Sequence, residues 1–369
     1  MKKFTILLLM CFLQFTNAEE FCVTTSAELN AAMLVASVNA ESDHIKIATG
    51  SYLVESGFLR GTYTYNSTEN FDLEVSGGWS EFFNNPCGQN LGGSSFQTNL
   101  NGDEELRVMS INTGMNSDIK VSGLTFSNGK ATDVPEFGAG LFINMPPGAT
   151  GDVIVERNSF INNHAFASGA LRIVGGNRTD IKNNILILNE SDSGFPVMNI
   201  AQSDGYGVFA INNTIVLNTG GAYFNVDNSS QAMIVNNIFW DNEQADLGLI
   251  GTGFKYLRNN NIGTQSFNGN ASQTNADIRQ NNISSATDFE AGLLNFTPTV
   301  NSQMVGNGTK PPFIVPVPTP FSQNWFVGAI DNAGNTREQG NRVDIGAVES
   351  THQEWVEIPI FKNGFDLNK

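Results

Sequence analysis

Two arginines occupy positions where a basic group could act on a substrate. Arg258 and Arg279 each follow an apolar residue by one position, at the offset that Lys182 has in an earlier copy of the same pattern. Side chains that recur at one offset of a repeat lie on one face, so these cations could form a sparse basic stripe. The alternative is that this offset simply faces solvent, because Ile211 and Val235 interrupt the stripe. Arg258 and Arg279 are therefore weak catalytic candidates.

Three aromatic residues, Tyr223, Trp240 and Trp325, are weak candidates for ligand binding. An exposed aromatic plane offers apolar contact to the C–H groups of a pyranose ring. The alternative is packing in the core or at a turn, where most large aromatic side chains lie. These residues indicate glycan binding only if they surface along one face.

Metal and cofactor sites are poorly indicated. His44, His164 and His352 have no histidine or cysteine partner at the spacing of a zinc site. The glycine-rich stretches lack the Lys-Ser/Thr pair of a nucleotide-binding loop. Residues 99–105 and 331–338 are acidic but match no calcium-binding pattern, so weak calcium binding is the alternative to solvated loops. We expect no metal site and no cofactor.

The charge of the chain restricts its partners. The 369 residues carry a formal net charge of −17 at pH 7. Such a surface repels phosphate backbones, so we expect no binding to nucleic acid or to anionic lipid. An anionic polysaccharide would need a local basic patch or bridging cations. The expected partners are extracellular polysaccharides or cell-surface components.

Residues 1–18 have the three parts of a signal peptide. Lys2 and Lys3 form a basic region, residues 4–15 an apolar region, and residues 16–18 a small-residue exit before Glu19. A membrane anchor is the alternative, but it needs about twenty apolar residues and this stretch is shorter. Removal of Lys2 and Lys3 takes the net charge to about −19. We expect export to the extracellular space or a bacterial cell surface, with no transmembrane segment in the mature chain.

The two cysteines that remain after export, Cys22 and Cys87, are expected to form a disulfide in an oxidising compartment. Closing so long a loop would stabilise the fold by about 4 kcal/mol if the geometry allows. The alternative is two unpaired thiols.

A nine-residue pattern, apolar-x-x-Asn-x-apolar-x-x-Asn, recurs through the middle of the chain and must position all these residues. Its first asparagines are separated by 26, 29, 24, 23 and 21 residues, which is the length of one solenoid turn built from short strands. Asparagine tolerates left-handed backbone geometry, and its amide can bond to the next turn. We expect a structural asparagine ladder beside a continuous apolar core, made of Asn158, Asn184, Asn213, Asn237, Asn260 and Asn281.

The repeat predicts an all-β protein, a right-handed parallel β-helix (solenoid) with a short N-terminal capping helix. Behind the signal peptide of residues 1–18, residues 19–42 form the N-terminal cap, where Thr25 and Glu28 fit a capping box. Residues 43–300 form the parallel β-helix. Residues 301–349 form a C-terminal extended segment, Pro-rich over 310–321, with a closing signature, and residues 350–369 form a tail.

The segments 43–52, 331–337 and 342–349, together with the asparagine repeat, resemble bacterial secreted β-helix proteins of the pectin-lyase-like superfamily. More narrowly, they are similar to choice-of-anchor Q domain proteins, whose C-terminal end carries an Asp-Ile-Gly-Ala-x-Glu signature, here Asp344 to Glu349. The resemblance covers nearly the whole mature chain and implies a fold and an exported location, but hardly an activity. In that family the signature commonly precedes an anchoring tail, and the tail here is too short to span a membrane.

The resemblance also raises the question of catalysis, because the superfamily contains pectate lyases and polygalacturonases. The motifs Asn-Thr-Asp, Asp-Asp, Gly-His-Gly and Arg-Ile-Lys of polygalacturonase-like sites do not occur in the chain. Pectate-lyase-like chemistry implies calcium held by aspartates and an arginine base, the role for which Arg258 and Arg279 are considered.

Two functions remain. The first is a non-catalytic secreted or surface protein for adhesion or glycan binding, which predicts no convergent acid-base cluster in any groove. The second is a polysaccharide lyase or glycoside hydrolase, which predicts an arginine or lysine beside two or more carboxylates on one parallel sheet. The missing motifs favour the first, although fold alone does not decide function.

Overall fold

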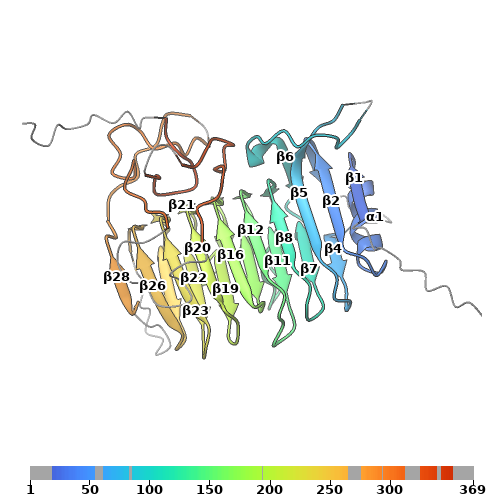
Figure 1. The fold of residues 1–369 in the computed structure, drawn as a ribbon, viewed down its shortest axis with the longest axis horizontal. Helices are drawn as coiled ribbons and strands as arrows, with labels where there is room; N and C mark the ends of the chain where they lie inside the picture. Colours follow the sequence, from blue (N-terminus) through green and yellow to red (C-terminus); the bar gives the residue numbers. More distant parts are fainter. Residues whose placement is uncertain are drawn as a thin grey trace, which may run out of the picture.

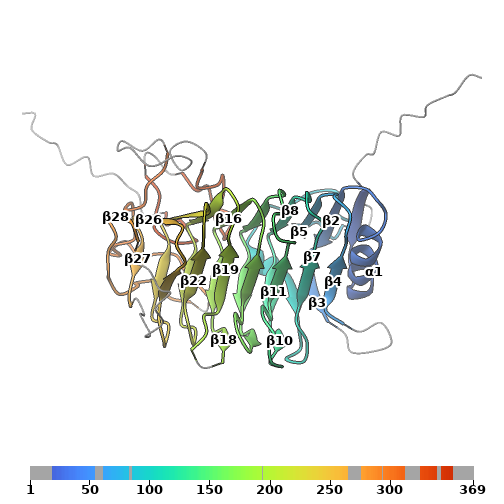
Figure 2. The same ribbon diagram turned by 90° about the horizontal axis from the view of Figure 1, so that it is seen from below.

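The computed structural model describes residues 19–54, 61–82, 85–192, 194–264, 276–292, 294–311, 325–338 and 342–351. Successive turns of the chain stack along the long axis of the molecule (Figures 1 and 2), and every ladder between them is parallel. A complete turn contributes one strand to each of three long sheets, which we call A, B and C. This arrangement is a right-handed parallel β-helix, as the repeat predicts.

The strands of each sheet follow in spatial order. Sheet A contains β1 (Glu19–Val23), β2 (Asp43–Ala48), β5 (Leu73–Trp79), β8 (Ile119–Ser122), β12 (Val153–Glu156), β16 (Arg178–Lys182), β20 (Gly207–Ile211), β23 (Gln231–Val235), β26 (Phe254–Arg258) and β28 (Ile278–Gln280). Sheet B contains β3 (Gly50–Leu53), β6 (Thr98–Asn101), β9 (Thr125–Ser127), β13 (Ser159–Ile161), β17 (Ile185–Ile187), β21 (Thr214–Val216), β24 (Ile238–Trp240) and β27 (Asn261–Ile262). Sheet C contains β4 (Tyr63–Asn66), β7 (Met109–Asn112), β11 (Leu141–Asn144), β15 (Leu171–Val174), β19 (Met198–Gln202), β22 (Ala222–Val226) and β25 (Leu247–Ile250).

A small fourth sheet joins the two-residue strands β10 (Lys130–Ala131), β14 (His164–Ala165) and β18 (Glu190–Ser191) between sheets B and C. The 3-10 helix η1 spans Ser95–Gln97. No helix in the described part of the chain is long and apolar enough to cross a membrane.

The inward-facing residues form one continuous apolar core. In sheet A this column is at most 1% exposed and runs through Val75, Val121, Val155, Ile181, Ala210, Ile234 and Leu257. Full burial of a valine, leucine or isoleucine contributes about 1.5–3 kcal/mol. The core therefore grows with each turn, as a solenoid requires.

The helix α1 (Ser26–Ala36) covers the N-terminal end of this core (Figure 2). Thr25 Oγ1 accepts from the backbone N–H of Glu28, and the Glu28 carboxylate accepts from the backbone N–H of Thr25, which confirms the capping box. Leu29, Ala32, Met33 and Ala36 are its buried face. Next to the cap, the structure joins Cys22 of β1 to Cys87 in a disulfide with a Cα–Cα distance of 5.6 Å.

Two asparagine ladders run along the turns. In the first, each side-chain amide donates to the amide oxygen of the next turn at 2.9–3.2 Å, in the order Asn158, Asn184, Asn213, Asn237, Asn260 and Asn282. The structure thus places five of the six predicted asparagines in one ladder. The sixth position is wrong: Asn282 completes the ladder instead of Asn281, because the last turn is one residue longer than the motif suggests and Arg258 aligns with Gln280.

The second ladder uses the other asparagine of the repeat. Asn163 donates to Asn189, Asn189 to Asn218 and Asn218 to Asn242 at 2.8–3.0 Å, and Asn242 donates to Asp246 at 2.7 Å. All five residues are buried.

Left-handed geometry belongs to the residues just before the first ladder. Asn183, Asn212, Asn236 and Asn259 have φ between 50° and 59°. Their side chains point outward and donate to carbonyl oxygens of Val327, Asp344, Thr309 and Asn307 at 2.7–3.0 Å. These turn asparagines therefore hold the C-terminal segment against the solenoid.

The C-terminal segment covers the outer faces of sheets A and B over the last turns, where Figure 1 draws it in orange and red above β20 to β28. One apolar cluster contains Phe209, Met233 and Tyr256 under Trp325 and Val343. A second contains Val216 and Ile238 with further side chains of 296–348. The expectation of an extended segment over the surface falls in part on residues 312–324, which lie outside the described residues.

The closing signature is buried and bonds both to residues 331–337 and to the solenoid. Asn212 Nδ2 donates to the carbonyl oxygen of Asp344, and the backbone N–H of Ala347 donates to Thr214 Oγ1. Arg337 is 0% exposed, its Nη1 lies 3.4 Å from Glu349 Oε2, and it donates to the carbonyl oxygens of Asp344 and Gly346. Asp331 Oδ2 accepts from the backbone N–H of Glu349 at 2.7 Å. Burial raises the pKa of Glu349 to about 8, with Arg337 opposing the rise and Asp344 adding to it. The signature thus fastens the end of the chain onto the solenoid.

Candidate functional site

The open outer face of sheet C carries the best candidate site. Its outward residues follow the period of two along each strand, and one row across the sheet contains Phe142, Arg172, Asn199, Tyr223 and Gly248 in register. Neighbouring members of the row are separated by about 4.8 Å, the spacing of paired strands. The first four have intermediate exposure, so their side chains form a continuous surface.

Tyr223 lies flat on this surface because the next strand offers a glycine. A Cβ atom added to Gly248 would come within 2.5 Å of two carbon atoms of the Tyr223 ring. The ring therefore covers Gly248 with one face, while the side chain as a whole stays half-buried. An aromatic plane held parallel to a sheet is the geometry that stacking on a sugar ring requires.

Two asparagines next to Tyr223 carry amide oxygens that lack a partner. Asn199 is its register neighbour on β19, and Asn225 is two residues further along β22 on the same face. The Oδ1 atoms of both are buried and accept no hydrogen bond from any described residue. An unpaired buried acceptor costs about 1–3 kcal/mol, and an amide that turns its oxygen toward a hydroxyl or amine of a ligand would recover this free energy.

The other end of the row is basic and aromatic. Arg172 lies over the ring of Phe137, with 5.6 Å from its Cζ atom to the ring centroid, and Arg107 lies over Phe142 at the same distance. Arg107 Nε also donates to the carbonyl oxygen of Phe137 at 3.2 Å. Burial lowers the pKa of both guanidinium groups.

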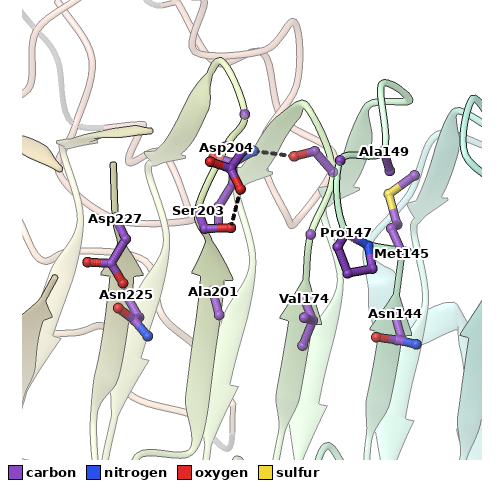
Figure 3. Close-up of a pocket in the computed structure, with 15 residues that line it drawn as sticks. Asn144, Met145, Pro147, Ala149, Val174, Ala201, Ser203, Asp204, Asn225 and Asp227 are labelled. Carbon is purple, nitrogen blue, oxygen red and sulfur yellow. Dashed lines mark hydrogen bonds between the residues drawn. The ribbon is translucent and has the colours of Figure 1, made fainter. Parts of the chain in front are cut away.

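A hollow of about 240 Å³ opens where the strands of sheet C end (Figure 3). Val174, Ala201 and Asn225 form its floor on three neighbouring strands, and Asp204 and Asp227 stand above them in the view of Figure 3. Because Asn225 also neighbours Tyr223, the hollow and the aromatic platform form one continuous site.

The structure separates the three aromatic candidates. Trp240 is the outward residue of β24 and packs in the apolar cluster beneath the C-terminal segment. Trp325 is 3% exposed and packs against Phe209 and its neighbours. Only Tyr223 faces an open sheet. The condition that the three surface along one face is therefore not met, because the C-terminal segment covers the outer side of sheets A and B over the last turns.

The two arginine candidates do not form a stripe. Arg258 is 8% exposed and donates to Tyr256 Oη and Gln280 Oε1 at 3.3 Å each. Arg279 aligns with the inward residue Leu257 rather than with Arg258, owing to the extra residue in the last turn. The two arginines therefore occupy different positions of the repeat, and the lyase role implied for them gains no support from this placement.

A charged cluster lies instead on sheet A. Lys120 Nζ is 2.9 Å from Glu74 and 3.8 Å from Glu156, on three strands of one parallel sheet. His44 neighbours Glu74 at 3.9 Å, and burial lowers its pKa. This is the arrangement of lysine and carboxylates that the enzymatic alternative predicts, at residues the sequence did not single out. Its charges already neutralise one another through ion pairs.

In the two acidic segments considered for calcium, side-chain oxygens accept hydrogen bonds from backbone N–H groups of the same segment. Asp331 Oδ1 accepts from the backbone N–H of Asn335 at 2.8 Å, and Asn101 Oδ1 accepts from the backbone N–H of Asp103 at 2.9 Å. Within the described ranges, no group of three or more histidine, cysteine, aspartate or glutamate side chains is placed to hold a metal ion.

The sequence analysis did not identify Asn199, Asn225 or the hollow. The alternation that indicates them was present in β19 and β22, where every second residue is apolar and the remaining ones include both asparagines and Tyr223.

The chain matches no family model, no curated protein and no solved structure in comparisons with known proteins.

Proposed function

We propose that this protein binds glycans non-catalytically through the outer face of sheet C and acts in adhesion or glycan contact outside the cell. The observation that carries the proposal is the Tyr223 ring, which lies flat over Gly248 beside two amide oxygens without partners. Aromatic planes provide apolar contact to sugar rings, and unpaired amide oxygens accept hydrogen bonds from sugar hydroxyl groups.

An exported location and the narrower family belong to the same proposal. The signal-peptide pattern of residues 1–18 and the Cys22–Cys87 disulfide both favour an oxidising compartment. The closing signature Asp344 to Glu349 supports the resemblance to choice-of-anchor Q proteins of the pectin-lyase-like superfamily, and its burial suits a role in closing the fold.

The test is binding of the purified chain to a panel of neutral, acidic and amino-containing oligosaccharides, measured by calorimetry. We expect Tyr223→Ala to weaken binding by about tenfold or more, as loss of a central aromatic contact does. Phe82→Ala is the matched control, because Phe82 is 65% exposed and belongs to another surface. The proposal fails if no glycan binds, or if Tyr223→Ala binds as tightly as the wild type.

A polysaccharide lyase or hydrolase centred on Lys120 is the second candidate. It is favoured by one observation, the placement of Lys120 between Glu74 and Glu156. The same panel, followed by absorbance of unsaturated products and by new reducing ends, tests it. Product formation that disappears with Lys120→Ala and persists with Lys130→Ala, an exposed lysine of β10, would establish it in place of simple binding.

A further inference from the structure

The hollow at the end of sheet C has an acidic wall with no basic side chain. Among its lining residues are the carboxylates of Asp204 and Asp227, and none of the described residues that line it is lysine, arginine or histidine. Asp204 accepts from Ser203 Oγ at 2.9 Å and from Asn228 Nδ2 at 3.2 Å. Asp227 Oδ1 accepts from the backbone N–H of Thr252 at 2.9 Å. Neither carboxylate forms an ion pair with a described residue, so both negative charges remain available.

The nearest cation is already engaged. Lys255 lies close enough for the charge of Asp227 to act on it, but its Nζ donates to the carbonyl oxygens of Gly251 and Gly253 at 2.6 Å each. It does not line the hollow. Lys255 therefore offsets part of the charge of Asp227 from outside the hollow and leaves the hollow itself without a cation.

Two of the residues that line the hollow have amide oxygens without donors. Gln202 is 3% exposed, and its Nε2 is fixed by the carbonyl oxygens of Gly176 and Asn177 at 2.6 Å, while its Oε1 accepts no hydrogen bond from a described residue. Asn225 Oδ1 likewise accepts no hydrogen bond from a described residue. Two carboxylates and two amide oxygens without donors together call for a ligand that brings several donors.

We propose that this hollow binds the protonated amino group of an amino sugar whose glycan lies on Tyr223. An ammonium group brings three donors and a positive charge, so it meets both the unpaired oxygens and the carboxylates. A hydroxyl group would satisfy the oxygens but leave the carboxylates without a counter-charge, and a uronate would be repelled. The volume of about 240 Å³ lies below the range of drug-sized sites, which suits one substituted ring.

This inference rests on the proposed glycan binding and specifies its ligand class. Asn225 connects the two parts, because it lines the hollow and lies on the same face of β22 as Tyr223, about 7 Å along the strand. One ring stacked on Tyr223 therefore places an amino group, on itself or on the next unit, at the mouth of the hollow.

The test compares matched pairs of short oligosaccharides, glucosamine oligomers with free amines and the same oligomers fully N-acetylated, by calorimetry on the full chain at pH 6. We expect the free-amine oligomer to bind about tenfold tighter, because each partly exposed charge contact contributes about two- to fivefold. Asp204→Asn with Asp227→Asn should reduce this preference to less than about twofold. Glu243→Gln, an exposed acid on the turn after β24, controls for net charge.

Each outcome decides between the two proposals. Equal or tighter binding of the acetylated oligomer, or an unchanged preference in the Asp204/Asp227 double variant, overturns the amino-sugar inference while glycan binding stands. Tri-lysine that binds as tightly as the free-amine oligomer also overturns it, since a sugar would then be unnecessary. If the free-amine oligomer binds Tyr223→Ala as tightly as the wild type, charge attraction alone holds it and the inference is overturned. Absence of binding to every glycan of the panel defeats both proposals.

Discussion

Replacing Asn184 by leucine should break the first asparagine ladder at its middle. The Asn184 Oδ1 atom accepts from the backbone N–H and the side-chain amide of Asn158, at 2.9 and 3.2 Å. Its Nδ2 donates to the carbonyl oxygen of Val155 at 2.8 Å and to Asn213 Oδ1 at 2.9 Å. Asn184 is 0% exposed, so water cannot replace these partners.

The magnitude follows from the groups that would be left without a partner. The side chain of Asn158 keeps its bond to the carbonyl oxygen of Val121, and Asn213 Oδ1 keeps the backbone N–H of residue 184. The backbone N–H of Asn158 loses its partner. The carbonyl oxygen of Val155 loses one donor, but its strand stays paired with β16. One buried backbone group without a hydrogen bond costs about 1–3 kcal/mol.

The assay is urea unfolding followed by far-ultraviolet circular dichroism. The control is Asn66→Leu, which makes the same exchange on an exposed strand position of sheet C and should change the free energy of unfolding by less than about 0.5 kcal/mol. If Asn184→Leu lowers the free energy of unfolding no more than Asn66→Leu does, the ladder does not stabilise the solenoid and the reasoning is refuted.

Three further results are expected. Replacing Cys22 and Cys87 by serine should lower the free energy of unfolding by about 4 kcal/mol in urea, since the bond closes a loop with a sequence separation of 65. Burial raises the pKa of Glu349 from 4.5 to about 8 in the folded state. The folded protein therefore keeps this proton to a higher pH than the unfolded chain, and the free energy of unfolding should fall as pH rises from about 4.5 to 8. Thermal unfolding of Glu349→Gln should lack this decline. Gly248→Ala should displace the ring of Tyr223 and weaken glycan binding in calorimetry with the fold intact.

Each of these expectations has a contrary outcome. Unfolding midpoints unaffected by loss of the disulfide would show that the cap is held by α1 alone. A Glu349→Gln variant with the same pH profile as the wild type would remove Glu349 as the titrating group. Gly61→Ala is the control for Gly248→Ala, because nothing lies within 4 Å of an added Cβ there, and equal binding by both variants would contradict the stacking geometry.

The periodic part of the fold could be predicted because it depends on local chemistry that repeats. Asn158, Asn184 and their successors mark the turns in the sequence, and the capping box at Thr25 marks the start of α1. The final turn could not be aligned from the motif alone. In that turn, Ile278 and Asn281 have the spacing of the repeat. Strand pairing nevertheless aligns Gln280 with Arg258, which brings Asn282 into the ladder.

The path of the C-terminal segment was the larger omission. It decides which outer faces stay open, and its contacts join residues more than 130 positions apart, such as Asn212 and Asp344. A partial signal exists in β20 and β23, where Phe209, Met233 and their neighbours are apolar on both faces of the strand. A strand whose residues are all apolar is typically buried on both faces of its sheet.

Amide hydrogen exchange of the glycan-bound protein tests most directly whether sheet C is the binding face. With the tightest ligand of the panel, we expect added protection in β15, β19 and β22 and in the loops at residues 145–152 and 203–206, and none in sheet A. Protection centred on β5, β8 and β12, around Lys120, would contradict it.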